Sequence, residues 1–478
     1  IVLPGIDESA QRAAEMKRAA PNAIEVIDSE QIQQFNERTL GDSLRRLPGV
    51  TFDSANRSRE IRLRGLPGEY TQVLINGRRL VDGESRRSFE VDRIPSGLVD
   101  RIEIIRSPRA SQSGQGPAGT VNVVLKSGAD IPEGTEISVD GGYLEDQGGI
   151  GGFTASHAGS VGPLSFNLAA SLQQTRRSES KDELEFDGNG APDGGKLELN
   201  ERRFEQFNFT PTFELDMGSG GTLTLNPFYF FTEEFRDDIE TELEGNQVTV
   251  EEVANEARER EREAYGIRAA WDVDLSSQTN LRLSFDWQEG RTDTVRDEVV
   301  FDANGAPIET KDKTENIDLE RIRPEAVLST QLGAHDLSFG VGANLQIYDE
   351  TNAEVKTKAG GTPEPKVKAA RVFEIDEDII FGFVEDVWEP TEHLTITGGL
   401  RIEDSSTDTT DISGATNGND ETFLLPSINA VYTLSSQTDL RAGLARTLRR
   451  PDLRTLSPTF EEKDGKPSKP DEQGNPDQ

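Results

Sequence analysis

Residues 394–403, LTITGGLRIE, alternate between apolar and polar side chains along most of their length. In an extended strand successive side chains point to opposite faces. One face would then carry the apolar side chains of Leu394, Ile396, Leu400 and Ile402. The other face would carry the polar side chains of Thr395, Thr397, Arg401 and Glu403. The stretch therefore predicts a strand that lies between an apolar and a polar environment.

The same pattern recurs through most of the chain after about residue 130. It is clear in LSFNLAASL (164–172), LRLSFDW (281–287) and LSFGVGANLQI (337–347), and about thirteen segments show it in all. Two fold classes share this alternation. One is a soluble antiparallel sandwich, and the other is a transmembrane β-barrel whose outer face meets lipid.

The connections between these segments favour the barrel. Short turns recur at DMGSGG (216–221), LSSQTN (275–280), TQLGAH (330–335), PTEH (390–393) and LSSQTD (434–439). Long polar stretches lie between them, near residues 176–203, 237–262, 294–316 and 350–370. Alternating short and long connections are typical of outer-membrane barrels, whereas a Greek-key sandwich has no reason to alternate in this way. We expect the polar stretches to be external loops, with a short helix at VEEVANEARERERE (250–263).

Composition excludes several classes of function. The chain has 478 residues and a net charge of −37, from 88 acidic and 51 basic side chains. Such a chain lacks the net basic surface that nucleic-acid binding requires. It has no cysteine, which excludes disulfides and thiolate metal sites. Its hydrophobic fraction of 33% suits a barrel, because only alternate residues of each strand need be apolar.

Residues 23–130 have a different pattern, that of a compact α+β domain. Asp28 and Gln31 form a capping box for a short helix, and a second helix is expected to begin at Thr39. Strand-like segments follow, and Asn76-Gly77 predicts a type I′ turn. Residues 1–22 show little periodicity and are predicted to be a linker.

Several stretches carry a family resemblance. SLRRLPGV (43–50), IRLRG (61–65), VLINGRRL (73–80), RIEIIRSP (101–108) and GTVNVVLK (119–126) resemble, in order, the plug domain of TonB-dependent outer-membrane receptors. FGFVEDVWEPTEHLTITGGLRIE (381–403) and ARTLRRPDLRTLSP (445–458) resemble parts of the barrel of this family. One departure is Arg106-Ser107-Pro108, where the family usually has Arg-Gly-Pro.

The resemblance implies a mainly β fold, with an N-terminal α+β plug domain inside a large antiparallel transmembrane β-barrel. The expected regions are 1–22 as TonB box and linker, 23–130 as plug, and 131–478 as a C-terminally incomplete barrel. Such barrels have about 22 strands, so we expect this sequence to be a fragment of a longer protein. The expected location is the outer membrane of a Gram-negative bacterium, with the plug facing the periplasm.

The resemblance also implies a function without catalysis. The protein is expected to import a scarce ligand by displacement of the plug, driven by the proton-motive force. A ferric siderophore is the favoured ligand, with oligosaccharides and cobalamin as alternatives in the same fold. A soluble β-rich binding or adhesive protein is the alternative from another class. His157, His335 and His393 lack metal-ligand spacing. GQGPAG (114–119) matches a dinucleotide-binding pattern but precedes a strand instead of a helix. We therefore expect no catalytic, cofactor or metal site.

Two sets of site residues follow from the resemblance. The TonB box is predicted at Ile1, Val2, Leu3, Pro4 and Gly5, where the periplasmic protein TonB would bind by strand addition, unless this is an ordinary disordered start. A latch between plug and barrel is predicted at Arg64 and Arg106, with Glu403 as one wall partner; solvated surface arginines are the alternative. The expected partners are TonB, outer-membrane lipid, lipopolysaccharide and a small ligand, and no nucleic acid.

Overall fold

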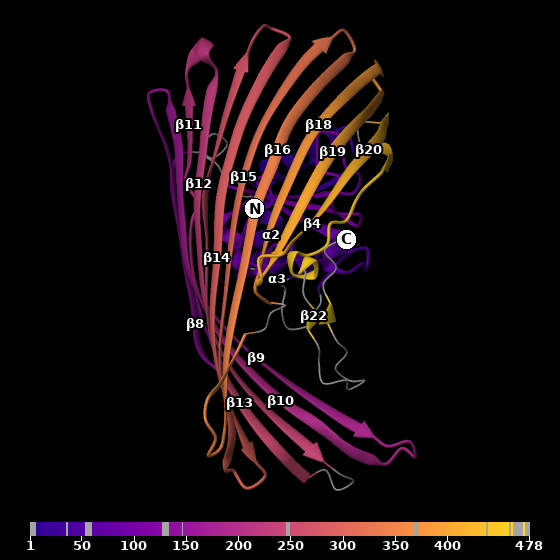
Figure 1. Ribbon diagram of the computed structural model, residues 1–478. Helices are drawn as coiled ribbons and strands as arrows, with labels where there is room; N and C mark the ends of the chain where they lie inside the picture. Colours follow the sequence, from indigo (N-terminus) through magenta and orange to yellow (C-terminus); the bar gives the residue numbers. More distant parts are fainter. Residues whose placement is uncertain are drawn as a thin grey trace.

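The computed structural model describes residues 6–34, 37–52, 60–126, 133–145, 147–244, 249–367, 371–435, 438–457, 460–461 and 472–473. A plug of short helices and strands lies against the concave face of one long curved antiparallel sheet, which we call the wall (Figure 1). The predicted fold class, a mainly β protein with an α+β plug, is confirmed.

The wall has thirteen strands in continuous order, each antiparallel to the next. They are β7 (Gly134–Leu144), β8 (Gly148–Val161), β9 (Leu164–Phe186), β10 (Pro192–Phe209), β12 (Thr222–Glu244), β13 (Thr249–Asp274), β14 (Thr279–Asp302), β15 (Pro307–Leu332), β16 (His335–Lys358), β18 (Phe373–Thr391), β19 (Leu394–Asp411), β20 (Thr416–Ser435) and β21 (Thr438–Ala445). Two short strands pair beside this path, β11 (Thr212–Asp216) and β17 (Glu364–Lys366). A separate pair is formed by β22 (Phe460–Glu461) and β23 (Glu472–Gln473).

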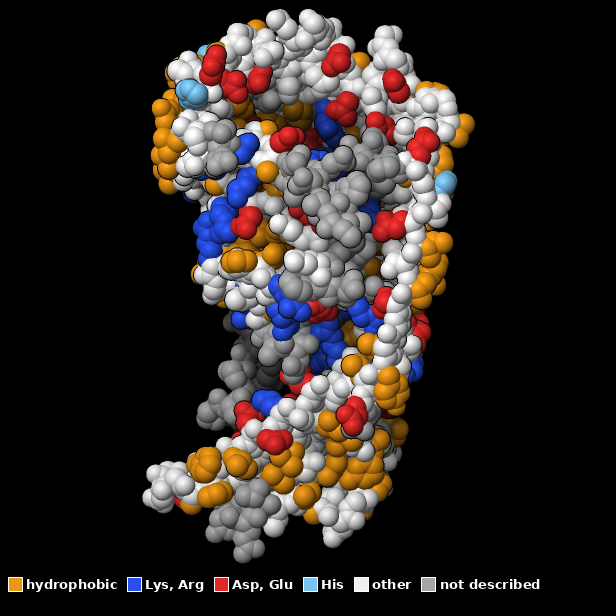
Figure 2. All heavy atoms as spheres, turned by 180° about the vertical axis from the view of Figure 1, so that it is seen from behind, with side chains coloured by type: hydrophobic (Ala, Val, Ile, Leu, Met, Phe, Trp, Pro, Cys, Tyr) orange, Lys and Arg blue, Asp and Glu red, His pale blue; other side chains and the backbone are white. Residues whose placement is uncertain are grey.

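The two faces of the wall differ as the alternation predicts. Leu400 and Ile402 are 43% and 46% exposed on the outer face, whereas Arg401 and Glu403 are 3% and 2% exposed and face inward. In Figure 2 hydrophobic side chains gather along the outer edges of the wall. On β13 the outward apolar band runs from Tyr265 to Trp271, a length of about 20 Å along the strand at roughly 3.3 Å per residue. An apolar outer band with aromatic borders is typical of a lipid-facing barrel wall.

The long polar stretches are not loops, so this prediction is wrong. Most of their residues continue β9 through β16 beyond the apolar band, and residues 250–263 lie in β13 instead of a helix. Backbone pairing holds these extensions together, with cross-strand ion pairs such as Lys196 with Glu240 at 2.7 Å and Lys356 with Glu309 at 2.7 Å. Outside the bilayer the outward side chains have no need to be apolar, so the alternation in hydrophobicity is lost while the strand continues.

Three of the long hairpins close with the same type of turn. DGNGA (187–191), DANGA (302–306) and DISGA (411–415) each begin with an aspartate and place a glycine at φ +80°. The Asp302 carboxylate accepts the backbone N–H groups of Asn304 and Ala306, both at 2.9 Å. Hydrogen bonds from backbone N–H groups, above all the one from Ala306, lower the pKa of Asp302 from its usual 3.8.

These turns should loosen in acid. The folded pKa of Asp302 is depressed, so the stabilisation is present above the unfolded pKa and is lost as pH falls through the folded value. We expect the Ala306 amide to lose hydrogen-exchange protection, corrected for intrinsic rate, below about pH 4, and Asp302→Ala to remove that protection at neutral pH. The β15–β16 turn at Gly333 and Ala334, which cannot titrate, is the control. Equal protection of Ala306 at neutral and acidic pH would contradict this account.

The plug is built on a four-stranded sheet of order β1-β5-β6-β4, in which β4 and β6 are parallel. Its elements are α1 (Ile6–Ala19), β1 (Ile24–Asp28), α2 (Ser29–Gln33), α3 (Leu40–Leu44), β2 (Val50–Phe52), β3 (Ile61–Leu63), η1 (Gly68–Tyr70), β4 (Thr71–Ile75), η2 (Val91–Arg93), η3 (Ser96–Leu98), β5 (Val99–Ile105) and β6 (Gly119–Leu125). Two further short helices lie among the described residues, η4 (Gly218–Gly220) between β11 and β12 and η6 (Leu453–Leu456) after β21. None of the helices in the described ranges is both long and apolar enough to span a membrane.

Local signals in the plug sequence are confirmed. The Asp28 side chain accepts the Gln31 N–H at 2.8 Å, and Thr39 caps α3. Asn76 and Gly77 have φ of +50° and +75°, as a type I′ turn requires. The predicted linker differs, since its residues 6–19 form helix α1.

Candidate functional site

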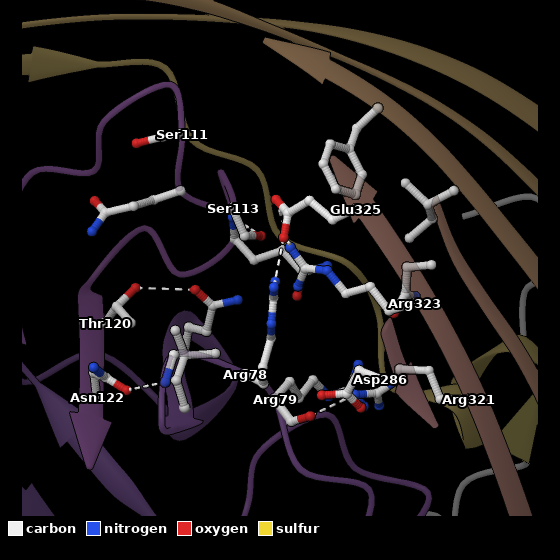
Figure 3. A pocket seen from close by; sticks show the side chains of 18 of the residues that line it. Arg78, Arg79, Ser111, Ser113, Thr120, Asn122, Asp286, Arg321, Arg323 and Glu325 are labelled. Atoms are coloured by element: carbon white, nitrogen blue, oxygen red, sulfur yellow. Dashed lines mark hydrogen bonds and ion pairs between the residues drawn. The ribbon is translucent and has the colours of Figure 1, made fainter. Parts of the chain in front are cut away.

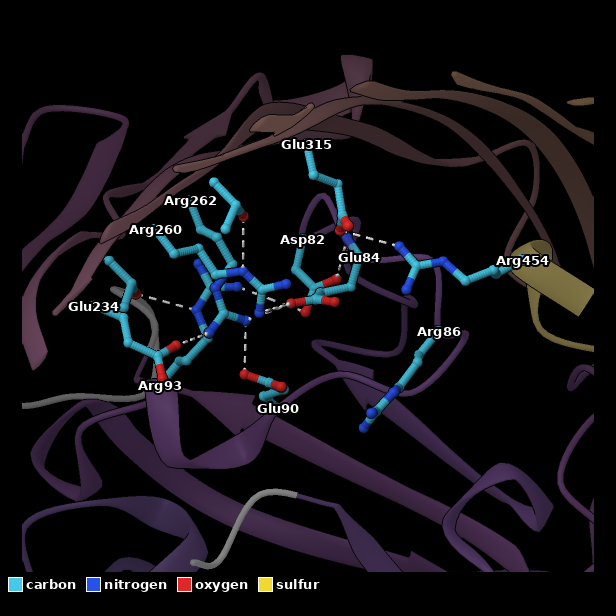
Figure 4. A network of polar contacts seen from close by, with 12 residues as sticks. Asp82, Glu84, Arg86, Glu90, Arg93, Glu234, Arg260, Arg262, Glu315 and Arg454 are labelled. Carbon is cyan, nitrogen blue, oxygen red and sulfur yellow. Dashed lines mark hydrogen bonds and ion pairs between the residues drawn. The ribbon is translucent and has the colours of Figure 1, made fainter. Parts of the chain in front are cut away.

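The most deeply buried contact between plug and wall surrounds Arg262 of β13. Its side chain is fully buried, and its Nη1 lies 3.0 Å from Glu84 and 2.7 Å from Glu90 of the plug. Its Nη2 lies 3.5 Å from Glu234 of β12, and the neighbouring Arg260 also binds Glu84 at 3.0 Å (Figure 4). Three carboxylates from two domains therefore share one guanidinium.

Plug arginines also bind wall carboxylates at several further places. Arg87 forms a two-pronged pair with Glu377 of β18, at 2.8 and 2.7 Å, and both side chains are buried. Arg78 lies 2.6 Å from Glu325 of β15, and Arg109 lies 3.1 Å from Glu385 of β18. The plug is thus held by ion pairs on several wall strands.

The predicted latch residues make other contacts, which corrects the prediction. Arg64 donates a hydrogen bond to the carbonyl oxygen of Arg106 at 3.3 Å, and Arg106 pairs with Glu25 at 2.9 Å, all within the plug. Glu403 binds Arg401 at 2.7 Å and Arg450 at 2.9 Å. Arg64 lies in the turn after β3 at φ +56°, and its side chain is directed along the plug surface.

The observed contacts come mainly from residues 78–93 and 109–111, most of which lie in irregular segments of the plug. Their sequence gave no periodic signal. The predicted TonB box, Ile1 to Gly5, lies outside the described residues.

A cavity of about 300 Å³ lies between the plug sheet and the wall (Figure 3). It is lined by seven arginines, namely Arg78, Arg79, Arg87, Arg268, Arg321, Arg323 and Arg401. It is also lined by five carboxylates, namely Glu103, Asp286, Glu325, Glu377 and Glu403. Arginines therefore outnumber acids around this cavity.

Arg321 is the clearest case of a guanidinium here that binds only neutral groups. It is 3% exposed and donates to the Arg79 carbonyl oxygen at 2.8 Å and to the Gln346 side chain at 3.2 and 3.3 Å. Burial, and then the charges of Arg321 and Arg87, lower the pKa of Arg79. The cavity is thus suited to an anionic group.

One group of acids among the described residues is close enough to share a cation. The carboxylates of Glu233, Glu259 and Glu261 lie within 4.8 Å of one another on β12 and β13. They lie on the face opposite to Glu234, Arg260 and Arg262, by strand alternation. This cluster is therefore not part of the interface between plug and wall.

Two glycines let the plug backbone touch the wall backbone. A Cβ added to Gly290 of β14 would lie 2.5 Å from the backbone nitrogen of Gly83 in the plug. A Cβ added to Gly83, which has φ +71°, would lie 2.6 Å from the carbonyl carbon of Arg291. Any side chain at either position would push the two domains apart.

Gly290→Ala should therefore weaken plug docking. Because the new methyl group meets backbone that cannot rotate away, we expect a loss of about 1–3 kcal/mol in the free energy of unfolding. The neighbouring hydrogen bond from the Val81 N–H to the Gln288 side chain, 2.9 Å long, should be lost with it. Denaturant unfolding of the purified full-length protein measures the effect. Gly398→Ala is the matched control, because nothing lies within 4 Å of its new methyl group; an equal loss in both variants would contradict the contact.

A lipid-facing antiparallel wall with a separate domain filling its inner side defines the class of plugged outer-membrane barrels. Two family models match this chain: the TonB-dependent receptor plug domain over residues 16–121, and the TonB-dependent receptor-like β-barrel over residues 186–477. The chain belongs to the TonB-dependent receptors. It is an integral outer-membrane protein of a Gram-negative bacterium, which excludes the soluble alternative.

Characterised relatives resemble the chain at low identity. The iron-regulated outer membrane virulence protein of Vibrio cholerae is 23% identical over 457 residues, covering 94% of this chain and 60% of that protein. The ferric enterobactin receptor of Pseudomonas aeruginosa is 24% identical, covering 94% of this chain and 61% of that protein. The chain thus spans about three-fifths of the length of these relatives.

Solved structures share the fold. The ferric citrate transporter FecA, in its unliganded form, matches with a TM-score of 0.60 and 16% identity, covering 90% of this chain and 63% of that structure. The copper transporter OprC matches with a TM-score of 0.59 and 16% identity, covering 91% of this chain and 66% of that structure. Proteins named for different cargoes therefore have this fold, and the fold alone does not identify a ligand.

Proposed function

We propose that the full-length protein is an energy-coupled import receptor for a scarce ligand, and that this ligand is a ferric siderophore. The observation that carries this proposal is the plug, which lies on the inner side of the wall and is tied to it by buried ion pairs. A diffusive porin has an open lumen, whereas here a ligand passing the plug must displace these contacts. Breaking a buried ion pair costs several kcal/mol, so passage needs an energy source.

The proposed energy source is the proton-motive force of the inner membrane, which TonB would transmit to the plug. Residues Ile1 to Gly5 would add a strand to TonB in the periplasm, and the pull would displace the plug. No bond in the cargo is changed. Iron is favoured because two of the relatives are named for iron regulation and for ferric enterobactin. Oligosaccharides and cobalamin remain alternative cargoes for the same mechanism.

Uptake by whole cells tests the proposal. Cells with and without the full-length gene, and cells whose protein lacks Ile1 to Gly5, are given radiolabelled ferric chelates. We expect loss of the gene to abolish uptake of at least one chelate. The shortened protein should still bind that chelate at the cell surface but fail to import it. If no ferric chelate depends on the gene, iron is not the cargo. If uptake persists after the proton-motive force is collapsed, energy coupling is contradicted.

A further inference from the structure

The cavity between the plug sheet and the wall holds more guanidinium groups than its carboxylates neutralise. Three of its arginines pair with lining carboxylates, namely Arg87 with Glu377, Arg78 with Glu325 and Arg401 with Glu403. Arg323 lies 3.7 Å from Glu325 and must share it. Glu103 is bound at 2.9 Å by Arg101, which does not line the cavity. Asp286 is the fifth lining carboxylate, and it accepts a hydrogen bond from the Gln288 amide at 2.6 Å.

Arg79, Arg268 and Arg321 make no ion pair with any residue in the described part of the chain. Arg268 donates to the Asn76 carbonyl oxygen and Arg321 to the Arg79 carbonyl oxygen, both at 2.8 Å. Both acceptors are neutral, so these hydrogen bonds leave the charges uncompensated. Asp286 alone cannot neutralise three cations. Uncompensated charge is unfavourable in a buried place, and burial followed by the charge of Arg321 lowers the pKa of Arg79.

The uncompensated cations come from both domains. Arg79 belongs to the plug, in the segment that follows β4, and no described residue accepts a hydrogen bond from its side chain. Arg268 and Arg321 belong to β13 and β15 of the wall. Figure 3 shows Arg321 and Arg323 reaching from the wall towards Arg78 and Arg79 of the plug. Positive groups of the two domains therefore face one another, and their repulsion opposes docking of the plug.

We infer that this cavity binds one small inorganic oxyanion, such as phosphate or sulfate, which joins the plug to the wall. Guanidinium groups bind the oxygens of such anions through paired, charge-assisted hydrogen bonds. An anion between Arg79 and Arg321 would replace their repulsion by two attractions. The volume of about 300 Å³ is at the lower end of the range for small-molecule pockets, which suits an anion with a few waters better than a bulky chelate. The anion is thus a component of the contact between plug and wall and not the cargo.

Such an anion should stabilise the docked plug. A ligand that binds only one state shifts the equilibrium towards that state by mass action. The site is complete only while plug and wall are together, because the plug supplies Arg79 and the wall supplies Arg268 and Arg321. Docking should therefore tighten as the concentration of oxyanion rises, and displacement of the plug should release the anion.

Phosphate binding to the purified full-length protein tests this inference. Inorganic phosphate is titrated at constant ionic strength, set with sodium chloride, and followed by calorimetry and by the melting temperature. We expect one saturable phosphate site, competition by sulfate, and a melting temperature that rises until the site is full. Arg321→Gln should weaken phosphate binding roughly tenfold, as loss of a charge-assisted hydrogen bond does. Arg79→Gln should have the same effect from the plug side.

Arg291→Gln is the matched control. Arg291 lies on β14 with its side chain 53% exposed on the outer face, away from the cavity. It should leave phosphate affinity unchanged within about twofold, because salt screens a distant exposed charge.

Each contrary result overturns a stated part of the inference. If phosphate does not bind, or binds equally well to the wild type, Arg321→Gln and Arg79→Gln, there is no such site. If binding depends on Arg321 but not on Arg79, the anion does not join the two domains. If sulfate fails to compete, the assigned oxyanion chemistry is wrong. An equal rise in melting temperature in Arg321→Gln would show a general salt effect and no site. None of these results decides whether the protein imports iron, so the import proposal is tested separately.

Discussion

Replacing Arg262 with alanine should detach this part of the plug from the wall. Glu84, Glu90 and Glu234 lose the guanidinium that they share, and their charges are left close together in a buried place. Removing one partner of a buried ion pair costs about 3–5 kcal/mol, and here one partner serves three acids. We therefore expect the largest stability loss of any single substitution at the interface.

Thermal or denaturant unfolding of the purified full-length protein measures this loss, and limited proteolysis reports whether the plug is released. Arg291→Ala is the control, because Arg291 is exposed on the outer face and pairs with Asp293 at 2.8 Å. An exposed pair contributes less than about 1 kcal/mol. If Arg262→Ala and Arg291→Ala lower stability equally, the buried cluster does not hold the plug.

The wall could be predicted because each strand carries its own evidence. In 394–403 the lipid-facing and plug-facing residues alternate, and the structure places Leu400 outward and Arg401 inward as expected. The caps at Asp28 and Thr39 and the turn at Asn76-Gly77 were predictable for the same reason. Each of these signals is formed by residues that lie within a few positions of one another in the sequence.

The contacts that hold the plug could not be predicted in this way. Arg87 and Glu377 are 290 residues apart, and only the curvature of the wall brings them together. The strand extensions were missed because outside the bilayer hydrophobicity no longer marks the outward face.

A disulfide between plug and wall should abolish import. A Cβ added to Gly97 of η3 would lie 3.8 Å from the Cβ of Thr154 on β8, which is the mean separation in disulfides. The chain has no cysteine of its own, so Gly97→Cys/Thr154→Cys would form a single defined bond. If import requires the plug to move away from the wall, this bond should prevent it. Each single-cysteine variant should import normally.

The measurement that tests the account most directly is uptake of a labelled ligand by cells carrying this double variant, first oxidised and then reduced. The account predicts that oxidised cells bind the ligand at their surface but import none, and that reduction restores uptake to the level of the single-cysteine variants. Unchanged uptake in cells whose protein is shown to be fully cross-linked would contradict it, because the ligand would then pass without displacement of the plug from β8.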